Sequence, residues 1–446
     1  VLFYVHGGNL TVDAANMFND TYIIENFVAH GIVMVIPEYR QTYAGTAVFD
    51  DRDLVPRNLA LHDLHFSLKW TNREIRNFGG NEEKITLMGH SSGAGFVLFL
   101  AFSPHFTNKE LKLFDKVISM SPGISFHSLE GQKNLTRIFV DTANCTRDTT
   151  QDVLDCMEQI GDDELFDVYE EYRKRTGELL NGIVLDEPIF PGKNYQELWK
   201  NPMKFSMLAG STAREMDLVP VSRKEDGELL GLRNAKELDQ IYEYLRNTSK
   251  IVTSHSMGTQ AIYISVYAFS AAVAQTGADV YLYSYDQMEH SGHSDDLSFL
   301  LGVHGYERDD NERVLAEFYP KLFRNYTLYD VPSPNWTPLD LSEDNYYSIK
   351  YYPDDNRFCE MRKPYEKATI DYWYRLAPKI DSYITKQKAR DRTLDLRDLV
   401  VLDGYRVHPE STAQYQHISE LETGVDLVGT ECTQLISKLQ SRDKAR

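Results

Sequence analysis

The segment KITLMGHSSGAGFVLFLAF, residues 84–102, restricts the possible folds of this 446-residue chain more than any other. A short apolar run, a glycine-rich corner and a second apolar run follow one another, which predicts a strand that turns sharply into a helix. The corner fits two motifs. Gly89, Ser91 and Gly93 form a G-x-S-x-G, in which the serine is an exposed nucleophile. Gly89, Gly93 and Gly95 form a G-x-x-x-G-x-G, which is related to the turn that cradles the phosphates of a dinucleotide.

Short apolar runs alternate with helical patterns along most of the chain. The predicted strands are residues 1–7, 31–39, 84–89, 116–122, 205–211 and 279–285, and the predicted helices include 58–78, 235–248 and 261–274. Most of the strands are continuously apolar, as parallel strands buried on both faces are. This alternation predicts an α/β fold with a central, mostly parallel sheet and helices on both faces.

The domain organisation follows from where this pattern stops. We expect one α/β domain over residues 1–385 and a charged, poorly periodic tail or accessory segment over residues 386–446. The chain begins at Val1 inside an apolar run, so we expect an N-terminally truncated sequence whose targeting segment lies upstream.

Charge, hydropathy and histidine spacing argue against several kinds of binding partner. The formal net charge of −20 argues against nucleic acid, which needs a basic footprint. The most apolar stretch, residues 261–274, is too short for a membrane span and contains Ser and Tyr. The histidines show no H-x-x-x-H or Cys/His ligand spacing, so we expect no metal and no cofactor. The sequence carries no signal for the oligomeric state.

The compartment is indicated by sequons and cysteines. Seven N-x-S/T triplets start at Asn9, Asn19, Asn134, Asn144, Asn247, Asn325 and Asn335, a number that favours a secreted glycoprotein. Cys145 and Cys156 enclose a short loop. Two reduced thiols of a cytosolic enzyme are the alternative, but the sequons favour a disulfide, worth roughly 3 kcal/mol on the loop-entropy model. We also expect Cys359 to pair with Cys432.

Each reading of the corner requires further residues. A short-chain dehydrogenase needs a helical Tyr-x-x-x-Lys, and the match at Tyr346 and Lys350 lies in a Tyr-rich, non-helical setting. An α/β-hydrolase needs a glycine loop before the corner, then an acid and a histidine that each follow a strand. The run FYVHGGN, Glu215 and His304 fit these requirements in the correct order. The hydrolase reading is therefore favoured.

Longer motifs make the resemblance specific. The run HDLHFSLKWTNREIRNFGGNEEKITLMGHSSGAG, together with HGGN, LFDKVISMSPG, VLDEPIFP, LAGSTAREMD and GVHGYE, resembles the type-B carboxylesterase/cholinesterase family over residues 1–380. That family has an α/β-hydrolase fold, with strands before the glycine loop that this sequence lacks, and a small disulfide loop where Cys145 and Cys156 stand.

The resemblance also implies roles for individual residues. Ser91 would be the nucleophile, Glu215 the acid and His304 the base. The backbone N–H groups of Gly8, Asn9 and Ser92 would form the oxyanion hole. Ser121 would correspond to the family's buried serine near the acid, and simple packing at the end of its strand is the alternative.

Competing residues exist for two of these roles. Asp217 could replace Glu215 as the acid, because Glu215 also completes a capping box that starts at Thr212. His290 and His293 lie nearer to the strand than His304, but in a polar stretch that looks solvated. The short-range sequence alone does not exclude them.

These features predict a serine carboxylesterase that acts on small-molecule esters. The family has Glu before the nucleophile, and this chain has His90 there, so we expect neutral esters to be preferred over cationic ones. The main alternative is a non-catalytic, cholinesterase-like adhesion or binding protein. A lipase-like hydrolase, in which G-H-S-x-G is common, and a short-chain dehydrogenase are less favoured.

Overall fold

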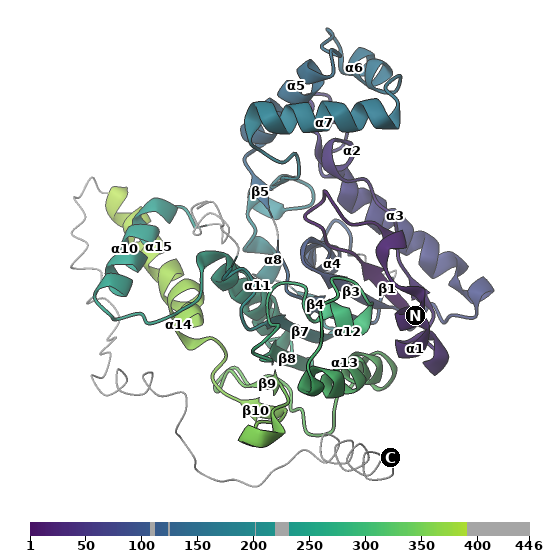
Figure 1. Cartoon of the computed structure of the whole chain (residues 1–446). Helices are drawn as coiled ribbons and strands as arrows, with labels where there is room; N and C mark the ends of the chain where they lie inside the picture. Colours follow the sequence, from purple (N-terminus) through teal and green to yellow (C-terminus); the bar gives the residue numbers. More distant parts are fainter. Residues whose placement is uncertain (108–111, 124, 201, 219–231, 390–446) are drawn as a thin grey trace.

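A computed structural model describes residues 1–107, 112–123, 125–200, 202–218 and 232–389 of the chain (Figure 1). Its centre is an eight-stranded sheet with the order β10-β9-β8-β7-β4-β3-β1-β2. All neighbouring strands are parallel except β9 and β10, which are antiparallel. The strands are β1 (Leu2–Val5), β2 (Met34–Val35), β3 (Thr86–His90), β4 (Lys116–Met120), β7 (Ser206–Thr212), β8 (Val280–Tyr285), β9 (Tyr346–Ile349) and β10 (Glu360–Arg362). A second, two-stranded sheet pairs β5 (Phe126–His127) with β6 (Ile183–Val184).

The predicted α/β class is confirmed, and all six predicted strands are present. The strand expected over residues 31–39 is reduced to β2, which pairs only with β1 at the edge of the sheet. Four described strands were missed: β9 and β10 of the central sheet, and β5 and β6 of the second sheet. The segment Tyr346–Ile349, which forms β9, contains two tyrosines and only one aliphatic residue. Its burial therefore depends on packing of the tyrosine rings, and it does not stand out in the sequence as a run of aliphatic residues.

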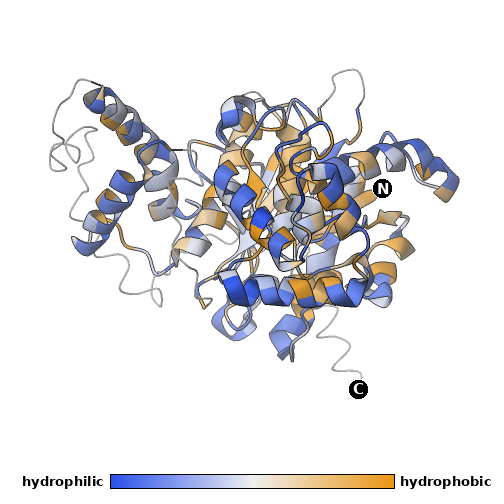
Figure 2. Cartoon of the chain, turned by 90° about the horizontal axis from the view of Figure 1, so that it is seen from above, coloured by the Kyte–Doolittle hydropathy of each residue, from blue (hydrophilic) through white to orange (hydrophobic). Residues whose placement is uncertain are grey.

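Helices cover both faces of the sheet, as expected from the alternation. One core lies beneath α3 (Leu59–Glu74), α4 (Ser92–Phe102), α8 (Glu197–Lys200) and α11 (Met257–Ala274). The other lies beneath α1 (Asp20–Asn26), α12 (Leu297–Leu300) and α13 (Asp310–Tyr329). Seen from above, the hydrophobic residues concentrate around the sheet and the hydrophilic ones on the outer helices (Figure 2).

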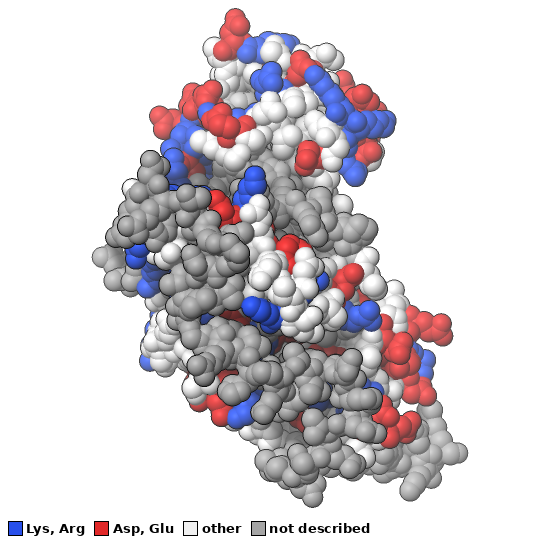
Figure 3. Space-filling model, turned by 90° about the vertical axis from the view of Figure 1, so that its left-hand side faces the viewer, with Lys and Arg blue, Asp and Glu red and all other residues white. Residues whose placement is uncertain are grey.

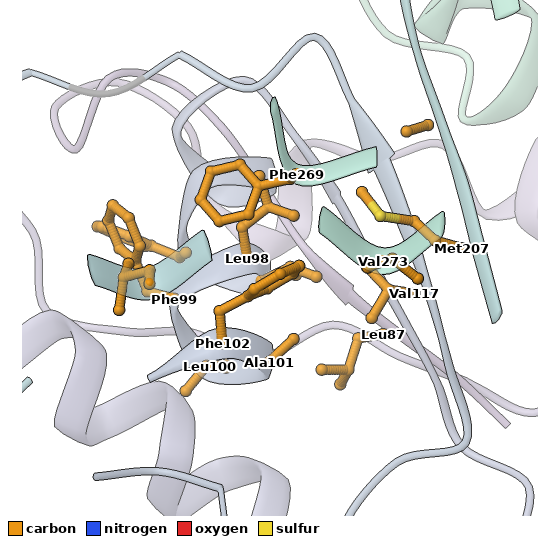
Figure 4. Close-up of a cluster of buried hydrophobic side chains, with 14 of the residues drawn as sticks. Leu87, Leu98, Phe99, Leu100, Ala101, Phe102, Val117, Met207, Phe269 and Val273 are labelled. Atoms are coloured by element: carbon orange, nitrogen blue, oxygen red, sulfur yellow. The ribbon is translucent and has the colours of Figure 1, made fainter. Parts of the chain in front are cut away.

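The first core explains why α4 and α11 are apolar on nearly all sides. Leu87, Val117 and Met207 stand in register on three neighbouring strands and face these helices (Figure 4). The ring centroids of Phe102 on α4 and Phe269 on α11 lie 4.7 Å apart. Of the helices in the described residues, α11 alone is long and apolar enough to cross a membrane, and 72% of that stretch is buried inside the protein.

A helical unit stands apart from the sheet, at the top of Figure 1. It consists of α5 (Leu129–Thr142), α6 (Thr150–Met157) and α7 (Asp162–Thr176), which share a small core. The predicted disulfide between Cys145 and Cys156 is present in this unit. Acidic and basic side chains are mixed over it (Figure 3), with acidic residues in the first turn of α7 and basic residues in the last, as the helix dipole favours.

A third core joins α10 (Ala235–Asn247) to the helices near the end of the described chain, η6 (Ile370–Leu376) and α15 (Ala377–Lys388). Helix α15 runs past residue 385, the boundary expected between domain and tail, and the rest of that tail lies outside the described residues. Cys359 is buried, and its expected partner Cys432 also lies outside them. The remaining short helices are η1 (Ala15–Met17), η2 (Val28–His30), α2 (Thr42–Thr46), η3 (Ile75–Phe78), η4 (Pro191–Lys193), η5 (Pro353–Asp355) and α14 (Lys367–Thr369).

Candidate active site

Ser91 occupies the sharp turn between β3 and α4, with φ 57° and ψ −128°. An L-residue adopts this conformation only at a cost of about 1–3 kcal/mol, and such strain is typical of functional sites. The glycines around it permit the turn. A Cβ on Gly89 would collide with the Gly93 carbonyl oxygen, and a Cβ on Gly93 would collide with that of Val5. The G-x-S-x-G spacing is therefore required by backbone contact.

Ser91 lies beside a histidine and a glutamate in one hydrogen-bonded row. Ser91 Oγ is 2.8 Å from Nε2 of His293, and Nδ1 of His293 is 2.5 Å from Oε2 of Glu215. Because a carboxylate can only accept, Nδ1 carries the proton that is donated to Glu215. Nε2 is then free to accept the hydroxyl proton of Ser91.

The surroundings of His293 favour its charged form. Its side chain is 14% exposed, and that of Glu215 is fully buried. Burial opposes protonation of the imidazole, but the charge of Glu215 and the hydrogen bond to it outweigh burial, so the pKa of His293 is raised above its ordinary value. Glu215 is itself held by the Thr212 N–H, which donates to Oε1 over 2.8 Å.

The histidine predicted from the sequence, His304, is not the one that the structure brings to Ser91. His304 is exposed, lies in the loop after Gly302, and makes no hydrogen bond within the described part of the chain. His293 holds the position because its main-chain N–H donates to the Glu215 carbonyl over 2.9 Å, which docks this loop onto the acid. The polar stretch around it, expected to be solvated, is folded against the site.

Distance along the chain was the signal that could have identified His293. It follows the end of β8 at Tyr285 by eight residues, whereas His304 follows by nineteen. A histidine that follows its strand by few residues needs only a short loop to lie at the carboxyl end of the sheet.

Asp217 and His290, which the sequence left open as acid and base, have different partners in the structure. Asp217 Oδ2 contacts His255 Nδ1 at 3.0 Å rather than His293. Nδ1 of His290 is 2.7 Å from Oε1 of Glu312, and its ring stacks on Tyr306. The choice of Glu215 as the acid thus agrees with the geometry, and the choice of His304 as the base does not.

The glycine loop after β1 passes directly against the nucleophile. A Cβ on Gly7 would lie 2.9 Å from Cβ of Ser91, and Gly8 has φ 87°, which other residues rarely adopt. Asn9 is exposed, with φ 53°, and its carbonyl oxygen accepts a 3.1 Å hydrogen bond from Asn181 Nδ2. The loop therefore lies in close contact with Ser91.

On the other side, Ser92 begins α4, whose first-turn N–H groups have no partner within the helix. Gly123, which was not predicted as a site residue, also borders the nucleophile: its N–H donates to the Ser91 carbonyl over 3.1 Å. Ser121 is fully buried after β4, and its hydroxyl has no hydrogen-bond partner among the described residues. In this part of the chain its hydroxyl is therefore not hydrogen-bonded to Glu215.

His90, the residue before the nucleophile, is 2% exposed and packs against the site. Its ring centroid is 4.9 Å from that of His293. Burial, with smaller contributions from the charges of His293 and His304, holds the pKa of His90 well below its usual range. His90 is therefore neutral at physiological pH.

The arrangement suits nucleophilic chemistry at a carbonyl or related centre. Among the residues that the structure describes, no group of three or more His, Cys, Asp or Glu side chains is arranged to hold a metal ion.

Comparisons with known proteins place the chain among the carboxylesterases and their relatives. The sequence profile described as the carboxylesterase family matches residues 1–247 and 233–373. Esterase cest-33 of Caenorhabditis elegans is 23% identical over 432 residues, covering 86% of this chain and 76% of the relative. Carboxylesterase 1C of Mus musculus is 23% identical over 386 residues, covering 77% and 68%. Neuroligin-2 of Mus musculus is 28% identical over 194 residues, covering 43% of this chain and 22% of the relative.

Proposed function

We propose that this chain, which belongs to the carboxylesterase family, is a serine esterase that hydrolyses neutral carboxylic esters through an acyl-enzyme. The observation that carries the proposal is the 2.8 Å contact between Ser91 Oγ and His293 Nε2, with His293 held by Glu215 at 2.5 Å. The nucleophile and its base are within hydrogen-bond reach, and a third group orients the base.

In the proposed reaction, Ser91 Oγ attacks the ester carbonyl while its proton passes to Nε2 of His293. Glu215 stabilises the imidazolium that forms, which is consistent with the raised pKa of His293. His293 then gives the proton to the departing alcohol. A water molecule, deprotonated in turn by His293, attacks the acyl-enzyme, and release of the acid restores Ser91.

The tetrahedral oxyanion would be held by the N–H groups of Gly8, Asn9 and Ser92. This role is supported by the loop that presses on Ser91 from one side and by the start of α4 on the other, where the helix dipole favours negative charge. Losing one such donor typically costs about 3–4 kcal/mol of transition-state stabilisation.

The preference for neutral esters rests on His90. It is buried, neutral and in contact with His293, so it offers no charge to a cationic alcohol group near the nucleophile. Exchanging a carboxylate for a neutral group about 5 Å from a cation forfeits on the order of 3 kcal/mol at an effective dielectric near 20.

A second candidate is a non-catalytic, cholinesterase-like binding protein, which the partial match to neuroligin-2 supports. The complete Ser91, His293 and Glu215 row favours the enzyme. We further infer that the protein belongs to the secretory pathway. The Cys145–Cys156 disulfide supports this, as do the sequon asparagines, all exposed except the half-buried Asn325.

Labelling with a fluorophosphonate probe tests the function. We expect stoichiometric labelling of the folded protein, complete loss in Ser91→Ala, and normal labelling in the neighbouring control Ser294→Ala. Folded protein that resists the probe and does not hydrolyse p-nitrophenyl butyrate would favour the binding protein.

A further inference from the structure

The turn that carries Glu215 is fixed from two sides. On the side of β8, the Ala213 N–H donates to the Tyr285 carbonyl and the Arg214 N–H to the Ser291 carbonyl, each over 2.9 Å. These bonds set where the turn leaves the sheet. With the His293 N–H that donates to the Glu215 carbonyl, they hold residues 213–215.

The second half of the turn is held by the start of α11. Asp217 Oδ1 accepts hydrogen bonds from the Ser256 N–H at 2.7 Å and from Thr259 Oγ1 at 2.8 Å. Its Oδ2 accepts one from His255 Nδ1 at 3.0 Å. The Met216 N–H donates to Thr259 Oγ1 over 2.9 Å. A carboxylate that accepts three hydrogen bonds at a helix N-terminus is firmly placed.

His255 extends this connection to a third segment. Its Nε2 lies 3.7 Å from Oε2 of Glu366, just before α14. The side chains of Asp217, His255 and Glu366 are 12%, 21% and 25% exposed, so the group is largely shielded from water. The His255 ring also packs edge-on against Tyr263, whose hydroxyl donates to the Ala213 carbonyl over 2.7 Å. Through Asp217 and Tyr263, the His255 side chain is thus connected to both ends of the turn of residues 213–217.

We propose that Asp217 is a positioning residue for Glu215: it ties the turn of the triad acid to the start of α11 and thereby sets the contact between Glu215 and His293. This inference rests on the proposed function of the triad. The short contact at 2.5 Å leaves little tolerance for movement of the turn. A displacement of about 1 Å in catalytic geometry can cost roughly 100-fold in rate.

The test compares Asp217→Ala with Asp279→Asn, which changes an exposed carboxylate that precedes β8 at the other end of the sheet. We expect Asp217→Ala to lower kcat about 10- to 100-fold with KM within about threefold. The acid limb of its kcat/KM profile should also move to lower pH, because a displaced Glu215 no longer raises the pKa of His293. Asp279→Asn should match the wild type in both respects.

A role confined to packing would reduce the folded fraction but leave the acid limb in place. Rates are therefore expressed per active site, counted with the fluorophosphonate probe. Unchanged kcat and an unchanged acid limb in correctly folded Asp217→Ala would overturn the proposal. If that variant does not fold, Thr259→Val serves instead, since it removes only the hydroxyl that bridges Met216 and Asp217.

A second readout needs no activity. A proton held between His293 Nδ1 and Glu215 gives a far-downfield proton NMR signal, which His293→Ala identifies by its loss. We expect this signal to weaken or shift in Asp217→Ala and to persist in Asp279→Asn. An inert wild-type protein with this behaviour would refute the esterase function while supporting the positioning role, and an unmoved signal would refute the positioning role.

Discussion

His293 is joined to Glu215 twice: its ring nitrogen Nδ1 lies 2.5 Å from the carboxylate, and its main-chain N–H donates to the Glu215 carbonyl over 2.9 Å. The second link uses only main-chain atoms. The loop that bears the histidine therefore keeps its docking point when the glutamate side chain is replaced, which makes side-chain variants at this position interpretable.

Glu215→Gln should separate geometry from electrostatics. An amide can donate to Nδ1 and so favours the wrong tautomer of His293, and we expect kcat to fall about 10⁴-fold. The acid limb of the residual activity should lie at lower pH than in the wild type. The reason is that the variant lacks both the charge and the charge-assisted hydrogen bond that raise the pKa of His293. Rate profiles between pH 4 and 8 measure the shift. An acid limb at unchanged pH would mean that another group controls it.

Histidine variants test the assignment made from the structure. We expect His293→Ala to lose at least about 10³-fold in kcat, as removal of a triad base does. His304→Ala should stay within about threefold of the wild type, because His304 is exposed and has no hydrogen bond in the described residues. Hydrolysis of p-nitrophenyl butyrate measures both. The opposite order would restore the sequence-based choice.

Substrate charge tests the role of His90. The wild type should hydrolyse a butyrate ester of a neutral alcohol with a higher kcat/KM than butyrylcholine. His90→Glu should raise the choline-to-neutral ratio by up to about a few hundredfold, since a carboxylate attracts the cation. His90→Gln, which is neutral like the native residue, is the control and should leave the ratio near its wild-type value. A wild-type preference for the choline ester would point to a cation site elsewhere.

Asp296 should make stability depend on pH. It is fully buried, and burial raises its pKa to about 7, although the hydrogen bond from Tyr319 opposes this. Between about pH 4 and 7 the folded protein keeps this proton and the unfolded chain has released it, so stability falls as pH rises. The contribution is at most about 1.4 kcal/mol per pH unit.

Urea unfolding of wild type, Asp296→Asn and the exposed control Asp279→Asn at pH 5, 6 and 7 measures this effect. As pH rises from 5 to 7, the free energy of unfolding of the wild type should fall relative to that of Asp296→Asn. The free energy of unfolding of Asp279→Asn should change with pH as that of the wild type does. Parallel curves for all three proteins would show that Asp296 ionises similarly in the folded and unfolded chain.

Local sequence patterns predicted the fold and two members of the Ser-His-Glu row. Ser91 is fixed by a strand, two glycines and a helix within a few residues, and Glu215 follows the end of the buried strand β7 by three residues. Both are short-range signals. The position of the histidine depends on which loop docks onto Glu215 by main-chain hydrogen bonds, and the sequence signal for it was only its shorter distance from β8. The strand β9 was missed for a related reason, since Tyr347 gains its burial by stacking on Trp336.

Gly93 matters for protein engineering because of the backbone that lies against it, in addition to its place in the G-x-S-x-G motif. Its missing side chain leaves room for the carbonyl oxygens of Val5 and His6, so at this position α4 approaches the strand before the glycine loop backbone to backbone. One position thus sets the spacing between Ser91 and the glycine loop without contributing a reactive atom. A mutational library that spared every reactive group but sampled position 93 would be depleted of working enzymes, and Gly93 would score there like a member of the catalytic apparatus.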